Sequence, residues 1–201
     1  MDARQYAPAT QRNREPILKV LSEILPAQSK ILEIASGTGE HALYFASELD
    51  CCWIPSDPNP LARESITAWQ NTCGLDNLEL PLSIDASADD WYRQLENREI
   101  NAIVNINMIH ISPWEACLGL FEGARAILPP GGVLYLYGPY KRDGEHTAAS
   151  NASFDRSLRD RNPAWGIRDL ERVVAAAAAQ NLKLEQVVNM PANNLSVVFT
   201  R

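Results

Sequence analysis

The stretch KILEIASGTGEH, residues 30–41, constrains the fold more than any other part of the chain. The apolar run at 31–34 predicts a short strand, and the closely spaced Gly37 and Gly39 predict a tight turn that opens a helix. Glycine lets the backbone approach a ligand without an intervening Cβ, and the N–H groups at the helix start can face polar or anionic ligand atoms. Glu33, just before the turn, is well placed to accept a hydrogen bond from an ammonium group.

This turn alone leaves several interpretations open. Gly37-x-Gly39-x-x-Ala42 also matches the dinucleotide-binding pattern G-x-G-x-x-A. A strand–turn–helix of this composition can equally be structural only. The decision therefore depends on the residues that follow.

Length and charge narrow the class of protein. A chain of 201 residues is most simply one domain, residues 1–201. A formal net charge of −7 disfavours broad phosphate-backbone contact, so nucleic acid is an unlikely partner. No apolar run reaches the roughly 18 residues that a membrane span needs, and the polar N-terminus lacks the apolar core of a signal peptide. We therefore expect no membrane partner and a cytoplasmic location.

The cysteines and histidines do not indicate a metal. The four cysteines form no C-x-x-C pair, which favours reduced thiols in a cytosolic protein. The three histidines show no metal-ligand spacing. We expect no metal site.

Apolar runs alternate with helical periodicity along the chain. They predict helices at 12–25, 40–49, 61–72, 113–128, 153–161 and 168–181, and further strands at 51–54, 78–84, 102–106, 133–137, 182–188 and 195–200. The turn PANN between the last two strands predicts an antiparallel hairpin. The order predicts an α/β, Rossmann-like fold: a mostly parallel, seven-stranded sheet with an antiparallel C-terminal hairpin and helices on both faces.

Two segments stand outside this alternation. We expect residues 1–11 to be irregular and Pro16 to lie near the first turn of the following helix, so that residues 1–26 form an N-terminal cap segment. Residues 142–165 are polar and too long for a simple connection, which predicts a lid.

Acidic residues follow three successive predicted strands. Glu33, Asp57 and Asp85 each stand near the carboxyl end of an apolar run, and ligands of open parallel sheets bind outside that end. Asp57, 18 residues after Gly39, suits a ribose diol. Its alternative role is to cap the next helix, and one carboxylate can serve both roles.

Five strands alternating with helices and a terminal hairpin resemble the class I S-adenosylmethionine-dependent methyltransferases over about residues 15–201. The acid and glycine turn resemble the first motif of that family, with Ala35 where glycine is frequent. The chain is more similar still to a domain family of unknown function, number 938, that includes methyltransferase-like protein 26. The stretches that carry this resemblance are RQYAPATQRNREPIL, ILEIASGTGEHALYFA, WIPSDPNP, NMIHISPWEA, GGVLYLYGPYK, NASFDRSLRDRNPAWGIRDLE and MPANNLSVVF.

The resemblance implies S-adenosylmethionine as cofactor and methyl transfer to an unidentified acceptor, for which the acidic charge and modest lid favour a small molecule. It implies cofactor contacts in four groups. Glu33 with the backbone of Ala35, Gly37 and Gly39 would hold the methionine portion, Asp57 the ribose, and Asp85 with Ala86 the adenine. Asn107 and Met108 would line the sulfonium end.

Further residues enter as hypotheses from their own chemistry. Arg12 can pair with the cofactor carboxylate, and Tyr6 belongs to the same polar cluster, which could fold over a ligand or be a solvated helix start. His110 is the candidate base, with a structural histidine as the alternative, and Tyr140 lies on the same rim. In the lid, Phe154, Asp155, Arg159 and Trp165 could shape an acceptor pocket.

Two other functions stay open. An NAD-dependent oxidoreductase fits the glycine pattern, but the terminal hairpin, Glu33 and Asp85 count against it. A non-catalytic module could keep the cofactor fold as a binding surface.

Overall fold

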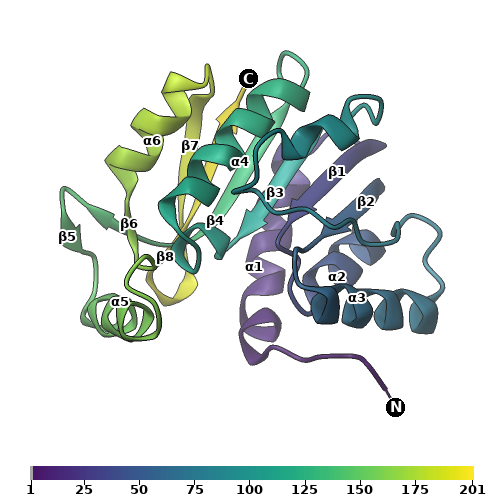
Figure 1. Cartoon of the computed structure of the whole chain (residues 1–201), viewed down its shortest axis with the longest axis horizontal. Coiled ribbons are helices and arrows are strands. Elements are labelled where there is room, and N and C mark those ends of the chain that lie inside the picture. The colour runs from purple at the N-terminus through teal and green to yellow at the C-terminus, as the bar shows by residue number, and fades with distance from the viewer. Residues whose placement is uncertain (1) are drawn as a thin grey trace.

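The computed structural model describes residues 2–201, and Met1, the first residue of the predicted cap segment, lies outside them. Within these residues, six strands form a continuous sheet in the order β2-β1-β3-β4-β8-β7 (Figure 1). Their bounds are β1 Ser29–Ile34, β2 Cys51–Ser56, β3 Ala102–Ile106, β4 Val133–Arg142, β7 Lys183–Met190 and β8 Asn194–Thr200. Two short strands, β5 Glu145–His146 and β6 Arg168–Asp169, pair with the far end of β4.

The strand directions match the predicted fold class. β1 pairs in parallel with β2 and β3, and β3 pairs in parallel with β4. β8 runs antiparallel to both β4 and β7, so the C-terminal hairpin inserts its second strand next to β4. A Rossmann-like α/β fold with a mostly parallel sheet and antiparallel C-terminal strands is thereby confirmed.

The strand predicted at 78–84 is wrong, because the described residues between β2 and β3 form no regular strand. Only two isolated parallel bridges, Trp53 to Leu78 and Ser56 to Leu82, attach this segment to β2. Pro81 lies between the bridged residues and has no N–H to donate to a ladder, which explains why regular pairing does not extend through the segment.

Helices cover both faces of the sheet (Figure 1). The α-helices are α1 Pro8–Ile24, α2 Glu40–Glu48, α3 Pro60–Cys73, α4 Trp114–Ile127, α5 Ala149–Arg161 and α6 Leu170–Ala179. Three single-turn 3₁₀ helices are η1 Trp91–Leu95, η2 Met108–His110 and η3 Pro191–Asn193. α4 and α6 pack on one face around Phe121 and Val173, and α1 and α2 pack on the other around Leu21 and Phe45. The two layers of core fix the strand ends, and with them the site.

The first helix begins earlier than predicted. α1 starts at Pro8 instead of residue 12, so Pro16 lies inside it and not in its first turn. Ala7 is extended, with φ −120° and ψ 110°, as a residue before proline should be. Pro8 suits a helix start because the first N–H groups of a helix have no intrahelical partner. None of the helices that the structure describes is long and apolar enough to cross a membrane.

Candidate functional site

The glycine turn after β1 takes the left-handed backbone that its sequence indicates. Ala35, Gly37 and Gly39 have φ of 59°, 56° and 87°. A Cβ on Gly39 would lie 2.8 Å from Cγ1 of Ile66 on α3, whereas one on Gly37 would meet nothing within 4 Å. Within the protein, Gly39 is therefore required for packing against α3, and Gly37 for the conformation of the turn.

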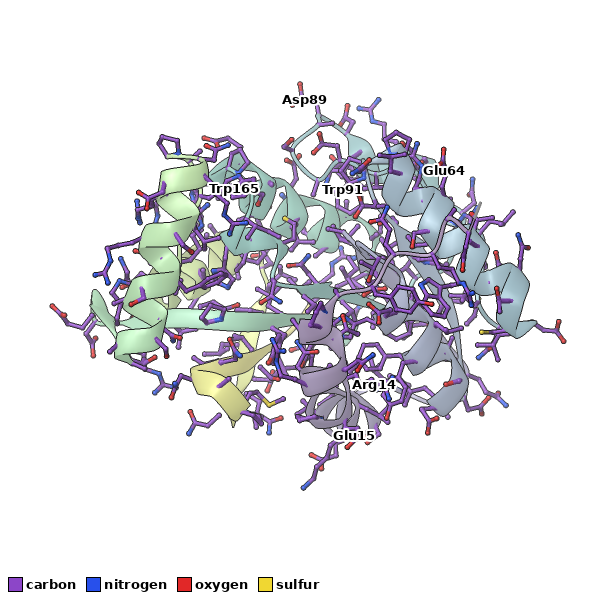
Figure 2. All side chains as sticks on the ribbon, turned by 90° about the horizontal axis from the view of Figure 1, so that it is seen from below. Arg14, Glu15, Glu64, Asp89, Trp91 and Trp165 are labelled. Atoms are coloured by element: carbon purple, nitrogen blue, oxygen red, sulfur yellow. The ribbon has the colours of Figure 1, made fainter. Side chains whose placement is uncertain are left out.

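A cavity of about 250 Å³ opens beside this turn, at the carboxyl ends of β1, β2 and β3. Six of the predicted cofactor residues line it: Ala35, Gly37, Asp57, Asp85, Ala86 and Met108. The other lining residues are Ile34, Pro58, Ile84, Ile106, Ile111, Ser112 and Ala116. Figure 2 views the molecule from below Figure 1, the side at which these strands end. The cavity combines apolar walls with two carboxylates.

The two carboxylates of the cavity are held by backbone and hydroxyl donors. Asp57 is 8% exposed, and it accepts from the N–H of Gly37 at 3.0 Å and of Asn59 at 2.8 Å. Asp85 is exposed and accepts from the N–H and hydroxyl of Ser87 at 2.9 and 2.6 Å. Both side chains are thus oriented by local donors, with their remaining acceptor capacity free.

Glu33 lies behind the turn and does not line the cavity. Its carboxylate is 1% exposed and accepts from the indole Nε1 of Trp53 at 3.0 Å. Burial raises the pKa of Glu33 to about 7, although hydrogen bonds from Trp53 and Ser36 favour the charged form. This carboxyl therefore titrates near neutral pH, directly beneath the glycine turn.

His110 and Tyr140, the predicted catalytic pair, are fully buried and do not line the cavity. Their rings pack edge to face with centroids 5.0 Å apart. The Nδ1 atom of His110 accepts from the N–H of Arg168 at 3.3 Å, which places the proton of a neutral ring on Nε2. Burial lowers the pKa of His110 to about 3. Within residues 2–201, the Tyr140 hydroxyl and His110 Nε2 have no hydrogen-bond partner.

Asn107, which the resemblance places at the sulfonium end, does not line the cavity, and its carbonyl oxygen accepts from the backbone N–H of His110 at 3.1 Å. It has a left-handed backbone, with φ 66°, at the end of β3. A Cβ added to Gly138 would lie 3.2 Å from Oδ1 of Asn107 and 2.5 Å from Nε2 of His110. The middle of β4, at Gly138, therefore approaches both side chains, and only glycine fits there.

Tyr6 and Arg12 lie outside the cavity lining. Tyr6 is 60% exposed and packs edge to face on Trp69 of α3. Arg12 is exposed on α1, whereas the adjacent Asn13 points inward, with Oδ1 2.8 Å from Nε2 of His41. From the polar start of α1, Asn13 thus contacts the helix after the glycine turn, and so does Arg14, whose guanidinium lies 4.6 Å from the ring centroid of Tyr44.

The predicted lid is tied to the body by one buried carboxylate. Asp155 on α5 accepts from the N–H of Ile167 at 2.7 Å, and its Oδ2 lies 3.6 Å from Lys141 Nζ, 3.4 Å from His146 Nε2 and 3.3 Å from Arg159 Nε. Phe154, in contrast, is 40% exposed. Residues 142–165 thus include a helix anchored on the extended end of β4.

Sequence reasoning missed several residues of this region. Ile34 and Ile106 end β1 and β3, and their position at a strand end was a signal that could have found them. Ala116 on α4 had no such signal. Trp53 was missed because its contact with Glu33 depends on the pairing of β1 with β2.

Comparisons with known proteins agree with this architecture. The sequence profile of the family described as "Protein of unknown function (DUF938)" matches residues 4–201. Among solved structures, an O-methyltransferase family protein from Burkholderia thailandensis superposes with a TM-score of 0.80 at 16% identity, over 96% of this chain and 57% of that one. An O-methyltransferase family 2 protein from Planctomyces limnophilus, solved with apigenin, superposes with a TM-score of 0.77 at 17% identity, over 96% of this chain and 60% of that one.

Human N-acetylserotonin methyltransferase, solved in complex with S-adenosylmethionine, gives a TM-score of 0.74 at 14% identity, over 96% of this chain and 52% of that one. The chain therefore spans between about half and three fifths of these three structures. At such identities, the likeness shows a shared fold.

Proposed function

The chain belongs to the DUF938 family, and from this premise we propose that it is an S-adenosylmethionine-dependent methyltransferase acting on a small-molecule acceptor. The resemblance to methyltransferase-like protein 26 is part of the same proposal. Support comes from the methyltransferase fold of its structural neighbours and from the chemistry of the cavity.

One observation carries the proposal: a single cavity brings together the carboxylates of Asp57 and Asp85 with apolar walls from Ile34, Ile84 and Ile106. A nucleoside presents a diol, an exocyclic amine and a flat apolar ring. Carboxylates accept from the first two groups, and aliphatic side chains cover the third. The residues of this cavity therefore fit the adenosine half of S-adenosylmethionine.

The remaining predicted residues would hold the methionine half. Glu33 would accept a hydrogen bond from the ammonium group. The turn of Gly37 and Gly39 would lie against the methionine portion of the cofactor. Asn107 and Met108 would line the sulfonium end. Arg12 and Tyr6 would reach the ligand only if the N-terminal segment moved, because neither residue lines the cavity.

When bound, the cofactor supplies a methyl group on a sulfonium, which is a good leaving group. The protein then has to orient the acceptor and exclude water. Met108 and Ile111, at the cavity wall, would exclude water from the reacting centre. Because His110 is neutral and buried, we assign it a supporting role in preference to direct proton transfer: its backbone N–H donates to the carbonyl oxygen of Asn107 at 3.1 Å, and Tyr140 packs against its ring.

Calorimetric titration with S-adenosylhomocysteine tests the proposal. Asp57→Ala should weaken binding roughly 10- to 100-fold, since a hydrogen bond to a charged group contributes about 1.5–3 kcal/mol. Asp89→Ala, which changes an exposed acid outside the cavity lining, is the matched control.

The rival functions are outcomes of the same titration. Binding of NADH without binding of S-adenosylhomocysteine would favour an oxidoreductase. Absence of binding by either ligand would favour a non-catalytic module. Binding of S-adenosylhomocysteine that Asp57→Ala leaves unchanged would remove Asp57 from the site.

A further inference from the structure

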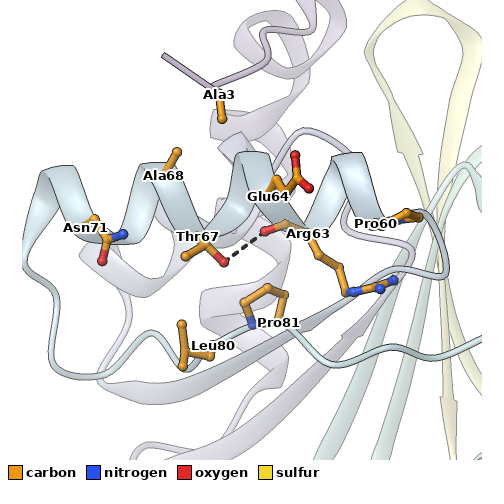
Figure 3. A pocket seen from close by; sticks show the side chains of 9 residues that line it. All are labelled: Ala3, Pro60, Arg63, Glu64, Thr67, Ala68, Asn71, Leu80 and Pro81. Atoms are coloured by element: carbon orange, nitrogen blue, oxygen red, sulfur yellow. Dashed lines mark hydrogen bonds between the residues drawn. The ribbon is translucent and has the colours of Figure 1, made fainter. Parts of the chain in front are cut away.

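The loop that carries Asp57 depends on one arginine of α3. Arg63 Nη1 donates to the carbonyl oxygens of Asp57 and Pro58, both at 2.8 Å. Its side chain lies in a groove of about 600 Å³ between α3 and Pro81, and Figure 3 shows it extending toward the start of the helix at Pro60. The opposite side of the same loop faces the cavity through the Asp57 carboxylate and Pro58.

Few other donors reach this loop. Pro58 and Pro60 have no N–H, and the N–H of Asn59 is already used by the Asp57 carboxylate. Among the described residues, Arg63 is the hydrogen-bond donor recorded for the carbonyls of Asp57 and Pro58. Backbone carbonyls need partners, so Arg63 fixes the path of the chain at these two residues.

The position of Arg63 is unfavourable for the helix itself. A cation in the first turn of a helix faces the positive end of the helix dipole, and α3 has no acidic residue in its first turn. Residues of good helix propensity without a charge would suit the helix better. The contacts with the loop therefore explain an arginine at this position, whereas the stability of the helix does not.

The Asp57 carboxylate is coupled to the glycine turn. Its Oδ2 accepts from the N–H of Gly37 at 3.0 Å. A shift of the Asp57 backbone would therefore move the carboxylate and loosen the turn together. Small displacements of a positioned group can cost large factors in binding or rate.

We propose that Arg63 is a positioning residue for the nucleoside site: it holds the Asp57 backbone so that the carboxylate meets both Gly37 and the ribose diol. This inference rests on the proposed function. It assigns to the outer groove a role in binding at the cavity on the other side of the loop.

The test compares Arg63→Ala, Arg63→Lys and the control Arg93→Ala. Arg93 lies in an exposed ion pair with Asp90, away from the cavity. We expect Arg63→Ala to raise the dissociation constant of S-adenosylhomocysteine about tenfold. Arg63→Lys should restore most of the affinity, because an ammonium has three donors for the two carbonyls. In a protein that already carries Asp57→Ala, Arg63→Ala should hardly change the dissociation constant of S-adenosylhomocysteine any further.

A second readout needs no ligand. Amide hydrogen exchange at Gly37 and Asn59 should accelerate in Arg63→Ala and stay unchanged in Arg93→Ala, since both N–H groups donate to Asp57. If exchange accelerates while the wild type binds no S-adenosylhomocysteine, the proposed function fails and the positioning contact stands. Unchanged exchange, or equal affinity of wild type and Arg63→Ala, overturns the inference.

Discussion

The indole Nε1 of Trp53 donates to the carboxylate of Glu33 at 3.0 Å, and both side chains are buried beneath the glycine turn. A carboxyl in such a place is costly to ionise, and burial raises its pKa to about 7 from an ordinary 4.5. Glu33 is thus the acidic group whose charge state can change when a cation binds nearby.

If Glu33 accepts from the ammonium of the ligand, binding should release a proton below pH 7. The free protein carries a protonated Glu33 at pH 6, and a bound cation would favour the ionised form. The affinity for S-adenosylhomocysteine should therefore rise roughly tenfold from pH 6 to pH 8. Calorimetry in two buffers of different ionisation enthalpy measures the released proton. Glu33→Gln should abolish the release, and a proton count near zero in the wild type at pH 6 would contradict the role.

The same carboxyl should affect stability with a definite sign. Between pH 4.5 and 7 the native state binds more protons at Glu33 than the unfolded state does, so its contribution to stability decreases as the pH rises. Above pH 7 the full cost, roughly 3 kcal/mol, is present. Glu33→Gln should thus be more stable than the wild type at pH 8 and nearly equal to it at pH 4.5.

Urea unfolding at the two pH values measures this difference. Glu64→Gln is the matched control, because Glu64 is exposed on α3. A Glu33→Gln protein that is less stable than the wild type at pH 8 would indicate that the Trp53 hydrogen bond to an ionised carboxylate outweighs the cost of burial.

His41 should have the opposite effect on the pH dependence of stability: its contribution decreases as the pH falls. Burial, with the charge of Arg14 adding to it, lowers the pKa of His41 to about 4. Below pH 6.5 the unfolded chain binds a proton that native His41 does not, so stability is lost as the pH falls from 6.5 toward 4. The loss is about 1.4 kcal/mol per pH unit in this range. His41→Gln can keep a contact with Asn13 and should reduce the loss.

Urea unfolding of wild type and His41→Gln at pH 6.5 and 5.5 isolates this contribution, because His110 and Glu33 titrate alike in both proteins. Equal losses in the two proteins would show that His41 is protonated in the native state at pH 5.5.

The sequence predicted the sheet well where the signal was local. Apolar runs mark the buried strands, and Asp57 and Asp85 follow strand segments closely enough to be found as strand-end acids. The early start of α1 has a local signal in Pro8, but the contact that supports it comes from a distant residue: the N–H of Ala7 donates to the Glu40 carboxylate. The contact of Glu33 with Trp53 depends on tertiary structure, so no local pattern could reveal it. Arg63 follows Asp57 by only six residues, but its contact with the loop depends on the path that the chain takes into α3.

The two glycines of the turn should differ in their tolerance of a side chain. Gly37→Ala places a Cβ in open space, and its cost is the left-handed backbone alone, about 1–2 kcal/mol. Gly39→Ala has the same backbone cost and adds a Cβ 2.8 Å from Cγ1 and 3.0 Å from Cα of Ile66. The backbone atom cannot yield easily, so α3 must shift, at a further cost of about 1–3 kcal/mol.

Because α3 carries Arg63, that shift should also reach the ligand site. Gly37→Ala is expected to weaken S-adenosylhomocysteine binding directly, because Gly37 lines the cavity and its Cβ would meet the ligand, whereas Gly39→Ala should weaken binding through the shift of α3. Both affinities are compared at matched fractions of folded protein. Thermal unfolding gives the order of stability and calorimetry the order of affinity. Combining Gly39→Ala with Ile66→Ala, which removes the clashing Cγ1, should recover part of the affinity although it opens space in the packing. A double variant that binds no better than Gly39→Ala would show that the backbone of α3, and not the Ile66 side chain, is what resists the added methyl group.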